Sequence, residues 1–237
     1  GAFSTAARCR LVLVAEDRQG RLAQLVSSAR SQLAARPDAA AWSTPDGVYF
    51  ARGEEAPPLG LLFPGQGAQY PNMLRDLASD FPGMLTALED ANRVFASAVP
   101  DSSQRLSDYI YPPTAFDDQA RRIREDSLRA TEVAQPAIGA VSLGALRVLE
   151  SFGLPGAAAA GHSYGELTAL CAAGRIAAED LHRLSRLRGE LMAAGSGDKG
   201  SMLAVPAPLA EIEKILAEEG LDLVIANRNA PSQAVLS

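Results

Sequence analysis

The chain has 237 residues and a formal net charge of −6 at pH 7, with 47% hydrophobic and 21% charged residues. This composition is that of an ordinary globular protein with one large core, or one core and a small subdomain. The acidic balance argues against nucleic acid as a partner, and no apolar run reaches the roughly 18 residues of a membrane span. The N-terminal residues lack the basic-then-apolar order of a signal peptide, which favours the cytoplasm. Cys9 and Cys171 fit neither a disulfide framework nor a metal site, so no metal is expected.

The first 55 residues predict a small α/β adapter. A strand is expected at 9–15, followed by a helix at 18–36 whose apolar residues recur on one face. Pro37 and Asp38 end that helix, and a second short strand is expected at 48–51. The segment GEEAPP at 53–58 is typical of a linker.

Residues 56–197 predict the main domain. An apolar strand at 59–63 is followed by the loop Pro64-Gly65-Gln66-Gly67, and a second apolar strand is expected at 157–160. The expected helices span residues 73–78, 81–98, 106–110, 134–152, 166–173 and 179–194. The helix at 134–152 is apolar nearly all round, which indicates burial in the core. Apolar strands that alternate with helices predict a parallel sheet covered on both faces.

The segment Gly161-His162-Ser163-Tyr164-Gly165 carries the strongest chemical signal. It lies between an apolar strand and a helix, which is the context of a nucleophile elbow. The flanking glycines suit a sharp turn, because a Cβ beside the serine would clash. An elbow exposes the Ser163 hydroxyl and presents the N–H of Tyr164 to a developing oxyanion. The alternative interpretation of the same residues is a structural turn.

A nucleophilic serine needs a general base, and the chain contains 2 histidines. His162 directly precedes the serine, so its side chain should point away, and we expect it to be packed and hydrogen-bonded. His182 lies on the helix predicted at 179–194 and is expected to be a partly exposed surface residue. Either the base comes from residues beyond 237, or the serine is not catalytic.

The helix at 179–194 carries an arginine in an unexpected position. Wound at about 100° per residue, it has an apolar stripe formed by Leu181, Leu184, Leu191 and Met192. Arg188 falls inside that stripe, where a guanidinium would need an anion. One interpretation is a salt bridge to a core carboxylate, or extension of the head group to water. The other is a bidentate site for a substrate carboxylate.

The loop at residues 65–67 also has two interpretations. Its backbone N–H groups could face an anion or oxyanion, or the loop could be a tight turn between strand and helix. It is not a phosphate loop, because no Gly-Lys-Ser/Thr follows. The arginine-rich segment 121–129 is interrupted by acidic residues and indicates a solvated face.

Residues 198–237 predict a small β-α-β unit that follows a glycine-rich break at 195–200. Strands are expected at 201–205 and 221–225 around a helix at 208–219, and another strand begins at 233. The segment 227–231 is typical of a turn. A half-built sheet leaves an unpaired edge, so we expect the natural polypeptide to continue.

Five motifs together resemble malonyl-CoA:acyl-carrier-protein transacylases and the acyltransferase domains of polyketide synthases. They are FPGQGAQ at 63–69, QPA at 135–137, GHSYGE at 161–166, RGELM at 188–192 and NAPSQ at 229–233. They follow the family's order and cover residues 58–237. The first 55 residues resemble the linker between ketosynthase and acyltransferase in type I synthases. Tyr164 departs from the smaller aliphatic residue or glutamine common after the serine, and resembles most the iterative synthases of enediyne antibiotic biosynthesis.

The resemblance implies a fold and a set of roles. The fold would be an α/β-hydrolase-like core with a parallel sheet, part of a ferredoxin-like subdomain at 198–237, and the N-terminal α/β linker. Ser163 would take a malonyl group from malonyl-CoA as an ester. The N–H groups of Gln66 and Tyr164 would form the oxyanion hole, and Arg188 would bind the malonyl carboxylate.

The resemblance also implies partners. The acyl group would pass to the phosphopantetheine thiol of an acyl carrier protein in ping-pong fashion, with a ketosynthase domain as neighbour and no bound cofactor. The family's catalytic histidine lies beyond the motif at 229–233, in the C-terminal remainder of the domain. His162, Gln135 and Asn229 are the expected supporting residues. The ring of Tyr164 is expected to narrow the acyl pocket.

Two other classes of protein share part of this pattern. An esterase or thioesterase of the α/β-hydrolase type has the elbow, but it has no use for a buried arginine or for the loop at 63–67. A non-catalytic fragment, or a module that only docks a carrier protein, needs no nucleophile. Reaction with malonyl-CoA distinguishes the three.

Overall fold

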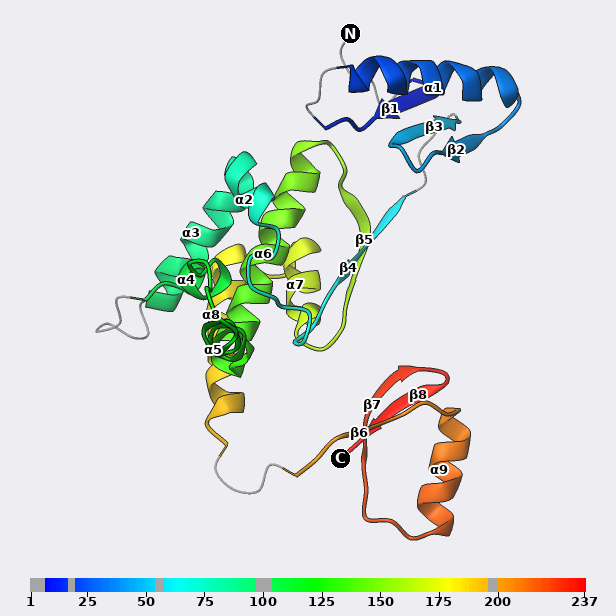
Figure 1. The fold of residues 1–237 in the computed structure, drawn as a ribbon. Helices are drawn as coiled ribbons and strands as arrows, with labels where there is room; N and C mark the ends of the chain where they lie inside the picture. The colour runs from blue at the N-terminus through cyan, green and yellow to red at the C-terminus, as the bar shows by residue number, and fades with distance from the viewer. Residues whose placement is uncertain (1–6, 17–19, 54–57, 97–103, 196–199) are drawn as a thin grey trace. The chain divides into compact units, whose positions relative to one another are not determined.

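The computed structural model describes residues 7–16, 20–53, 58–96, 104–195 and 200–237. Contacts between residues divide the chain into two compact units, Gly1–Gly60 and Leu61–Ser237, and we describe each by itself (Figure 1). Of the predicted linker, residues 54–57 lie outside the described residues, as does Gly197 of the glycine-rich break. None of the described helices is both long and apolar enough to cross a lipid bilayer.

The first unit is a three-stranded antiparallel sheet with one helix. Its elements are β1 (Cys9–Leu13), α1 (Arg21–Ala35), β2 (Ala41–Ser43) and β3 (Val48–Arg52), in sheet order β1-β3-β2. Leu25 and Ala29 of α1 pack on Trp42, Val48 and Phe50, and the rings of Trp42 and Phe50 stack 5.4 Å apart. The strand β2 was not predicted, because in a strand this short only Trp42 is buried.

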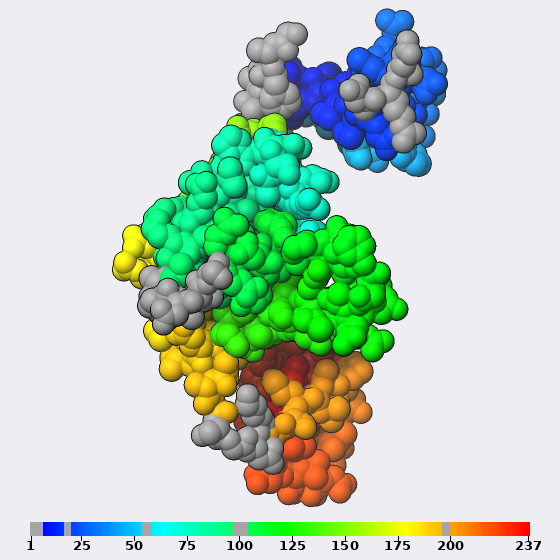
Figure 2. Space-filling model, turned by 60° about the vertical axis from the view of Figure 1, so that its left-hand side comes forward, coloured from blue at the N-terminus to red at the C-terminus, as the bar shows by residue number. Residues whose placement is uncertain are grey.

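The second unit begins inside β4 and contains helices and two further sheets. In chain order the elements are β4 (Leu59–Phe63), α2 (Arg75–Asp80), α3 (Pro82–Ala96), α4 (Leu106–Ile110), α5 (Asp118–Arg129), α6 (Thr131–Ser151), β5 (Gly156–Gly161), α7 (Gly165–Ala172), α8 (Ala178–Ala193), β6 (Leu203–Val205), α9 (Leu209–Glu218), β7 (Ile225–Ala230) and β8 (Gln233–Leu236). The fold is therefore mixed α/β. In the space-filling view, α2 to α5 form one continuous outer face of this unit (Figure 2).

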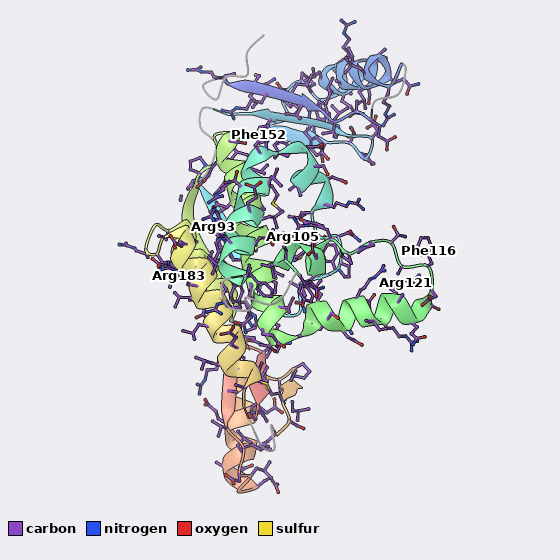
Figure 3. The ribbon with its side chains drawn as sticks, turned by 90° about the vertical axis from the view of Figure 1, so that its left-hand side faces the viewer. Arg93, Arg105, Phe116, Arg121, Phe152 and Arg183 are labelled. Carbon is purple, nitrogen blue, oxygen red and sulfur yellow. The ribbon has the colours of Figure 1, made fainter. Side chains whose placement is uncertain are left out.

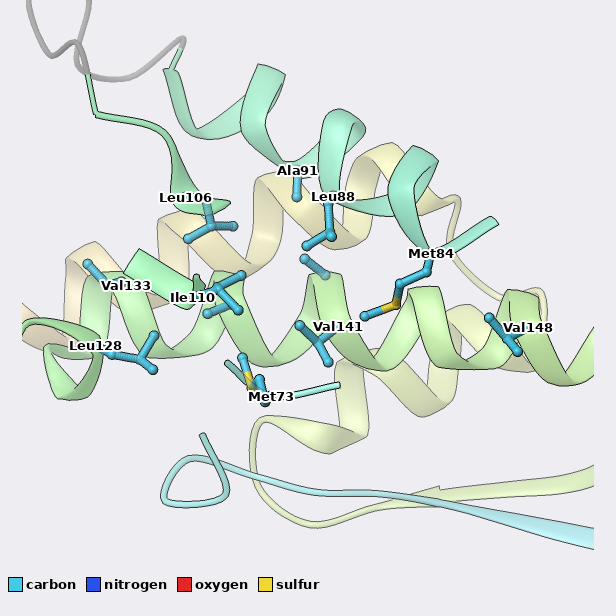
Figure 4. Packing of buried hydrophobic residues seen from close by; sticks show 12 residues of the cluster. Met73, Met84, Leu88, Ala91, Leu106, Ile110, Leu128, Val133, Val141 and Val148 are labelled. Carbon is cyan, nitrogen blue, oxygen red and sulfur yellow. The ribbon is translucent and has the colours of Figure 1, made fainter. Parts of the chain in front are cut away.

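The helix α6 is the centre of the second unit, as its all-round apolar sequence predicted. Side chains of α3, α4 and α5 converge on it, among them Met84, Ile110 and Leu128 (Figure 4). A Cβ at Gly144 would lie 2.2 Å from Met84 Sδ, so this glycine allows α3 to approach closely. Burial of such a surface is the main stabilising contribution to the unit.

The strands β4 and β5 pair with each other and end together. The N–H of His162, one residue after β5, donates to the carbonyl of Phe63, the last residue of β4, at 3.1 Å. Because their carboxyl ends meet, the two strands run in the same direction. The loop after β4 and the turn after β5 therefore lie at one edge of this sheet, the edge where ligands bind in parallel sheets.

The last 35 residues differ from expectation in two ways. Of the segment predicted as a turn, 227–231, residues 227–230 belong to β7, and of the strand predicted at 221–225, residues 221–224 lie before β7. Pairing with β8 overrides the turn preference of the asparagines. The sheet order is β6-β8-β7, so the final strand lies in the centre of the sheet and not at its edge.

The helix α5 was not predicted, because its apolar face is almost absent: only Leu128 is buried. The sequence feature that could have identified this helix is its N-cap residue, Asp117. The Asp117 carboxylate accepts a hydrogen bond from the N–H of Ala120 at 2.7 Å. Arg121 pairs with Asp118 at 3.0 Å on a solvated surface, and both Arg121 and Phe116 point outward at this end of the unit (Figure 3). Exposed pairs of this kind add little stability.

Candidate active site

The turn between β5 and α7 has the geometry of a nucleophile elbow. Ser163 adopts a φ of 52°, a left-handed conformation that non-glycine residues rarely adopt without support from their surroundings. The N–H of Gly165 donates to the His162 carbonyl at 2.9 Å, and that of Glu166 to the Ser163 carbonyl at 3.1 Å. The turn therefore leads directly into α7 and leaves Ser163 exposed at its tip.

Both flanking glycines are required by close contacts. A Cβ at Gly161 would lie 2.1 Å from the carbonyl carbon of Gly165, and a Cβ at Gly165 would lie 2.2 Å from the Phe63 carbonyl oxygen. Real Cβ atoms do not approach other atoms so closely, so neither position admits a side chain. The glycines of the sequence motif thus have a steric explanation in this structure.

The loop after β4 packs against this elbow. A Cβ at Gly65 would lie 2.5 Å from the carbonyl oxygen of His162 and 3.3 Å from Ser163 Cβ. Within the described part of the chain, neither the N–H of Gln66 nor that of Tyr164 donates to an acceptor. Two unengaged backbone donors therefore flank the serine, as an oxyanion hole requires.

Ser163 and Arg188 line the same cavity. This cavity has a volume of about 540 Å³, and its walls come from the elbow, α7, α8 and β7. Its lining residues are Gly161, His162, Ser163, Glu166, Arg188, Ala226, Asn227, Arg228 and Asn229. Arg228 pairs with Glu213 at 2.9 Å, whereas Arg188 has no ion-pair partner among the described residues. The Arg188 guanidinium is therefore available to bind an anionic ligand.

The buried face of α8 is not the predicted one. Leu184, Leu191 and Met192 are 39%, 67% and 53% exposed. The inner face is instead made of Leu181, His182, Ser185 and Gly189. A Cβ at Gly189 would lie 2.9 Å from the Thr131 carbonyl oxygen, so small residues let α8 approach α6. Arg188 is half-buried at the edge of this face, beside the cavity.

The Tyr164 side chain does not narrow the cavity, contrary to the prediction. Its ring is fully buried and extends away from the cavity to α6 and α8. Ser185 Oγ donates to the Leu181 carbonyl, so the Tyr164 hydroxyl is the donor in its own 2.5 Å bond to Ser185 Oγ. A Cβ at Gly139 would lie 2.0 Å from that hydroxyl. Burial raises the pKa of Tyr164 to about 12, so the phenol stays neutral.

Neither histidine bonds to the Ser163 hydroxyl, and they differ from expectation in burial. His162 is exposed, and its Nε2 donates to Asn229 Oδ1 at 3.1 Å, which joins the elbow to β7. His182 was expected at the surface but is 2% exposed, because it lies on the small-residue face of α8. Neither of its ring nitrogens has a hydrogen-bond partner among the residues that the structure describes. Burial lowers the pKa of His182 to about 4.

Gln135 is fully buried near the start of α6 and contacts the loop after β4. Its Nε2 lies 3.3 Å from Gln66 Oε1 and 3.3 Å from Met192 Sδ. Thr131 accepts a hydrogen bond from Gln66 Nε2 at 3.1 Å. Thr131, Gly139 and Ser185 were not singled out from the sequence, since no motif distinguishes them from ordinary helix residues.

A mixed α/β fold with a serine at a strand-to-helix elbow is an architecture of serine-dependent acyl transfer and hydrolysis. The chain belongs to the acyl transferase domain family, whose model matches residues 61–237.

Individual proteins of similar sequence or structure point to the same family. The polyketide synthase GfsE of Streptomyces halstedii is 30% identical over 233 residues, which cover 96% of this chain and 6% of that protein. The malonyl CoA-acyl carrier protein transacylase of Bacillus subtilis is 33% identical over 184 residues, 76% of this chain and 53% of that protein. A solved structure is also similar, the crystal structure of the acyltransferase domain from the second module of the salinomycin polyketide synthase. It superposes with a TM-score of 0.74 at 29% identity, and the alignment covers 98% of this chain and 48% of the salinomycin chain.

Proposed function

We propose that this chain carries the nucleophile half of a malonyl-specific acyltransferase that loads an acyl carrier protein in polyketide synthesis. One observation carries the proposal: Ser163, strained at the elbow, opens into the same cavity as Arg188, which has no anionic partner among the described residues. A malonyl thioester offers both an acyl carbon for the serine and a carboxylate for the arginine. An esterase has no need of an arginine that binds a substrate carboxylate.

In the proposed reaction, Ser163 Oγ attacks the thioester carbonyl of malonyl-CoA. The N–H groups of Gln66 and Tyr164 stabilise the oxyanion of the tetrahedral intermediate. The carbon–sulfur bond breaks, and coenzyme A leaves as a thiol with the proton from Ser163. The phosphopantetheine thiol of the carrier protein then attacks the seryl ester, which forms a new thioester and returns a proton to Ser163.

We further propose that the general base comes from the rest of the acyltransferase domain, outside residues 1–237. His162 Nε2 bears the proton that it donates to Asn229, and His182 is buried on α8, away from the cavity lining. The chain aligns with 48% of the length of the salinomycin acyltransferase structure, so its solved relatives carry further residues that could hold a histidine. Support of the elbow remains the proposed role of His162 and Asn229.

The finer assignments rest on the motif resemblance. We assign residues 56–197 to an α/β-hydrolase-like core, 198–237 to the first part of a ferredoxin-like subdomain, and 1–55 to a ketosynthase–acyltransferase linker. A ketosynthase neighbour, a cytoplasmic location and an iterative enediyne-type synthase are part of the same proposal. The pairing of β6 and β7 with a central β8, backed by α9, supports the subdomain assignment.

Intact-mass spectrometry tests the function. A polypeptide with the complete acyltransferase domain is incubated with malonyl-CoA or acetyl-CoA. We expect a malonyl adduct that Ser163→Ala abolishes and that holo carrier protein discharges. Rapid loss of the adduct to water, with no transfer to the carrier protein, would identify a thioesterase instead. An adduct of undiminished yield on the Ser163→Ala protein would refute the nucleophile.

A further inference from the structure

We propose that Thr131 and Gln135 are positioning residues, which hold the Gln66 side chain and thereby fix the backbone N–H of Gln66 beside Ser163. This inference rests on the proposed function, because it concerns the oxyanion hole. It adds two residues of α6 that are not among the residues that line the cavity.

The first observation is a pair of hydrogen bonds that use both ends of one amide. Gln66 Nε2 donates to Thr131 Oγ1 at 3.1 Å, and Gln66 Oε1 accepts from Gln135 Nε2 at 3.3 Å. Thr131 and Gln135 are four residues apart on α6, so they lie on one face of the helix. The amide of Gln66 therefore lies along the first turn of α6 with its orientation set by both partners.

The second observation is the contrast in exposure along these bonds. Gln66 belongs to an exposed loop, where a glutamine side chain ordinarily has several rotamers. Gln135 has no exposed surface and lies in the central helix of the unit. A loop residue bonded to a buried group takes on the order of that group. The two bonds thus transfer the rigidity of α6 to the loop that bears the oxyanion donor.

The third observation is that α6 is itself fixed where it binds Gln66. Gly189 of α8 packs directly on the first turn of α6, where its Cβ would lie 2.9 Å from the Thr131 carbonyl oxygen and 2.9 Å from Glu132 Cα. Gln135 Nε2 also lies 3.3 Å from Sδ of Met192, one helical turn after Arg188. The buried amide of Gln135 therefore contacts both the loop after β4, which bears the proposed oxyanion donor, and α8, which carries Arg188.

These contacts have a consequence for rate. The Gln66 N–H can stabilise the oxyanion only if it points at the reacting oxygen before the reaction begins. A displacement of about 1 Å can reduce catalysis up to a hundredfold. Loss of either bond should therefore lower kcat and leave the KM for malonyl-CoA unchanged, because the substrate carboxylate is bound by Arg188.

The experiment compares Thr131→Val, Gln135→Leu, the double variant and Thr131→Ser in the complete acyltransferase domain. Ser107→Ala is the matched control, because Ser107 Oγ also accepts from a side-chain amide, that of Asn92, at 3.1 Å, but between α3 and α4. The first readout is the single-turnover rate of seryl-ester formation at saturating malonyl-CoA. The second is hydrogen exchange in a peptide that covers residues 64–69, which requires no catalysis.

We expect Thr131→Val and Gln135→Leu each to lower the acylation rate about tenfold to a hundredfold and to accelerate exchange in the loop. The double variant should be little worse than either single one, and Thr131→Ser and Ser107→Ala should behave as wild type. Wild-type rates and exchange in both single variants would overturn the proposal. If the wild-type domain forms no ester, the proposed function fails, and the exchange measurement alone decides whether Thr131 and Gln135 hold the loop.

Discussion

Acidification should destabilise the second unit through His182. Burial is the main cause that lowers the pKa of this imidazole from 6.5 to about 4; Arg147 and Arg93 lower it further, and Asp90 opposes them. Asp90 and Arg93 lie on α3 and Arg147 on α6, so two of the helices that pack on α8 contribute. The folded-state pKa lies below the unfolded value. The neutral ring therefore contributes its full stability above pH 6.5, and that stability is lost as the pH falls towards 4.

The magnitude follows from the two pKa values. At 1.36 kcal/mol per pKa unit, their difference corresponds to about 3 kcal/mol of unfolding free energy. A typical domain has about 5 to 15 kcal/mol in total, so the loss is a substantial part of it. The structural cause is the burial of both ring nitrogens of His182, because a buried imidazolium would have two N–H donors and no acceptor within the described part of the chain.

Denaturant unfolding at pH values from 7 to 4, for wild type and His182→Leu, measures the effect. Helical circular dichroism is the appropriate signal, because the single tryptophan, Trp42, belongs to the first unit and its fluorescence does not report on α8. Carboxylates titrate in both proteins, so the difference between the two curves isolates His182. A constant difference between wild type and His182→Leu over this range would refute the reasoning.

Two further predictions concern the cavity and the core behind it. Arg188→Ala should weaken transition-state stabilisation for malonyl transfer by about 2 to 5 kcal/mol, and the loss should lie near the lower value because the guanidinium is half-exposed. The variant should also gain relative activity with acetyl-CoA. An unchanged malonyl preference in competition assays would show that the arginine has a structural role. Gly139→Ala should lower unfolding free energy by about 1 to 3 kcal/mol, since the new Cβ meets the Tyr164 hydroxyl, and Tyr164→Phe should restore part of it. Additive effects in that double-mutant cycle would exclude the contact.

The elbow could be predicted from sequence because its causes are local. A serine between two glycines, after a strand and before a helix, leaves few conformations, and the positive φ of Ser163 follows from them. The burial of α6 could be predicted equally well, because its apolar residues are distributed all round the helix. Both predictions use neighbours within a few positions of each other along the chain.

The inner face of α8 and the strand β7 could not be predicted in the same way. The packing of α8 is determined by close approach to α6 at Ser185 and Gly189, which a scale of hydrophobicity counts as neutral. Three large apolar residues that are exposed, Leu184, Leu191 and Met192, therefore led to the wrong inner face, and for the same reason His182 was expected at the surface. Asn227 and Asn229 favour a turn by themselves, but pairing with β8 extends them into a strand. The roles of Thr131 and Gln135 depend on a loop more than 60 positions earlier in the chain.

The contact between Tyr164 and Gly139 has a practical consequence for anyone who wishes to re-engineer this domain. The residue after the nucleophile occupies space that exists only because position 139 is a glycine and position 185 offers a hydroxyl. Positions 139, 164 and 185 are therefore one exchangeable unit. A smaller residue transplanted alone at 164 leaves a void behind the active site, and the Ser185 hydroxyl keeps only its bond to the Leu181 carbonyl. A tyrosine transplanted into a relative with alanine at the position of Gly139 has no room. Grafts of this elbow succeed or fail on residues that lie far from it in the sequence.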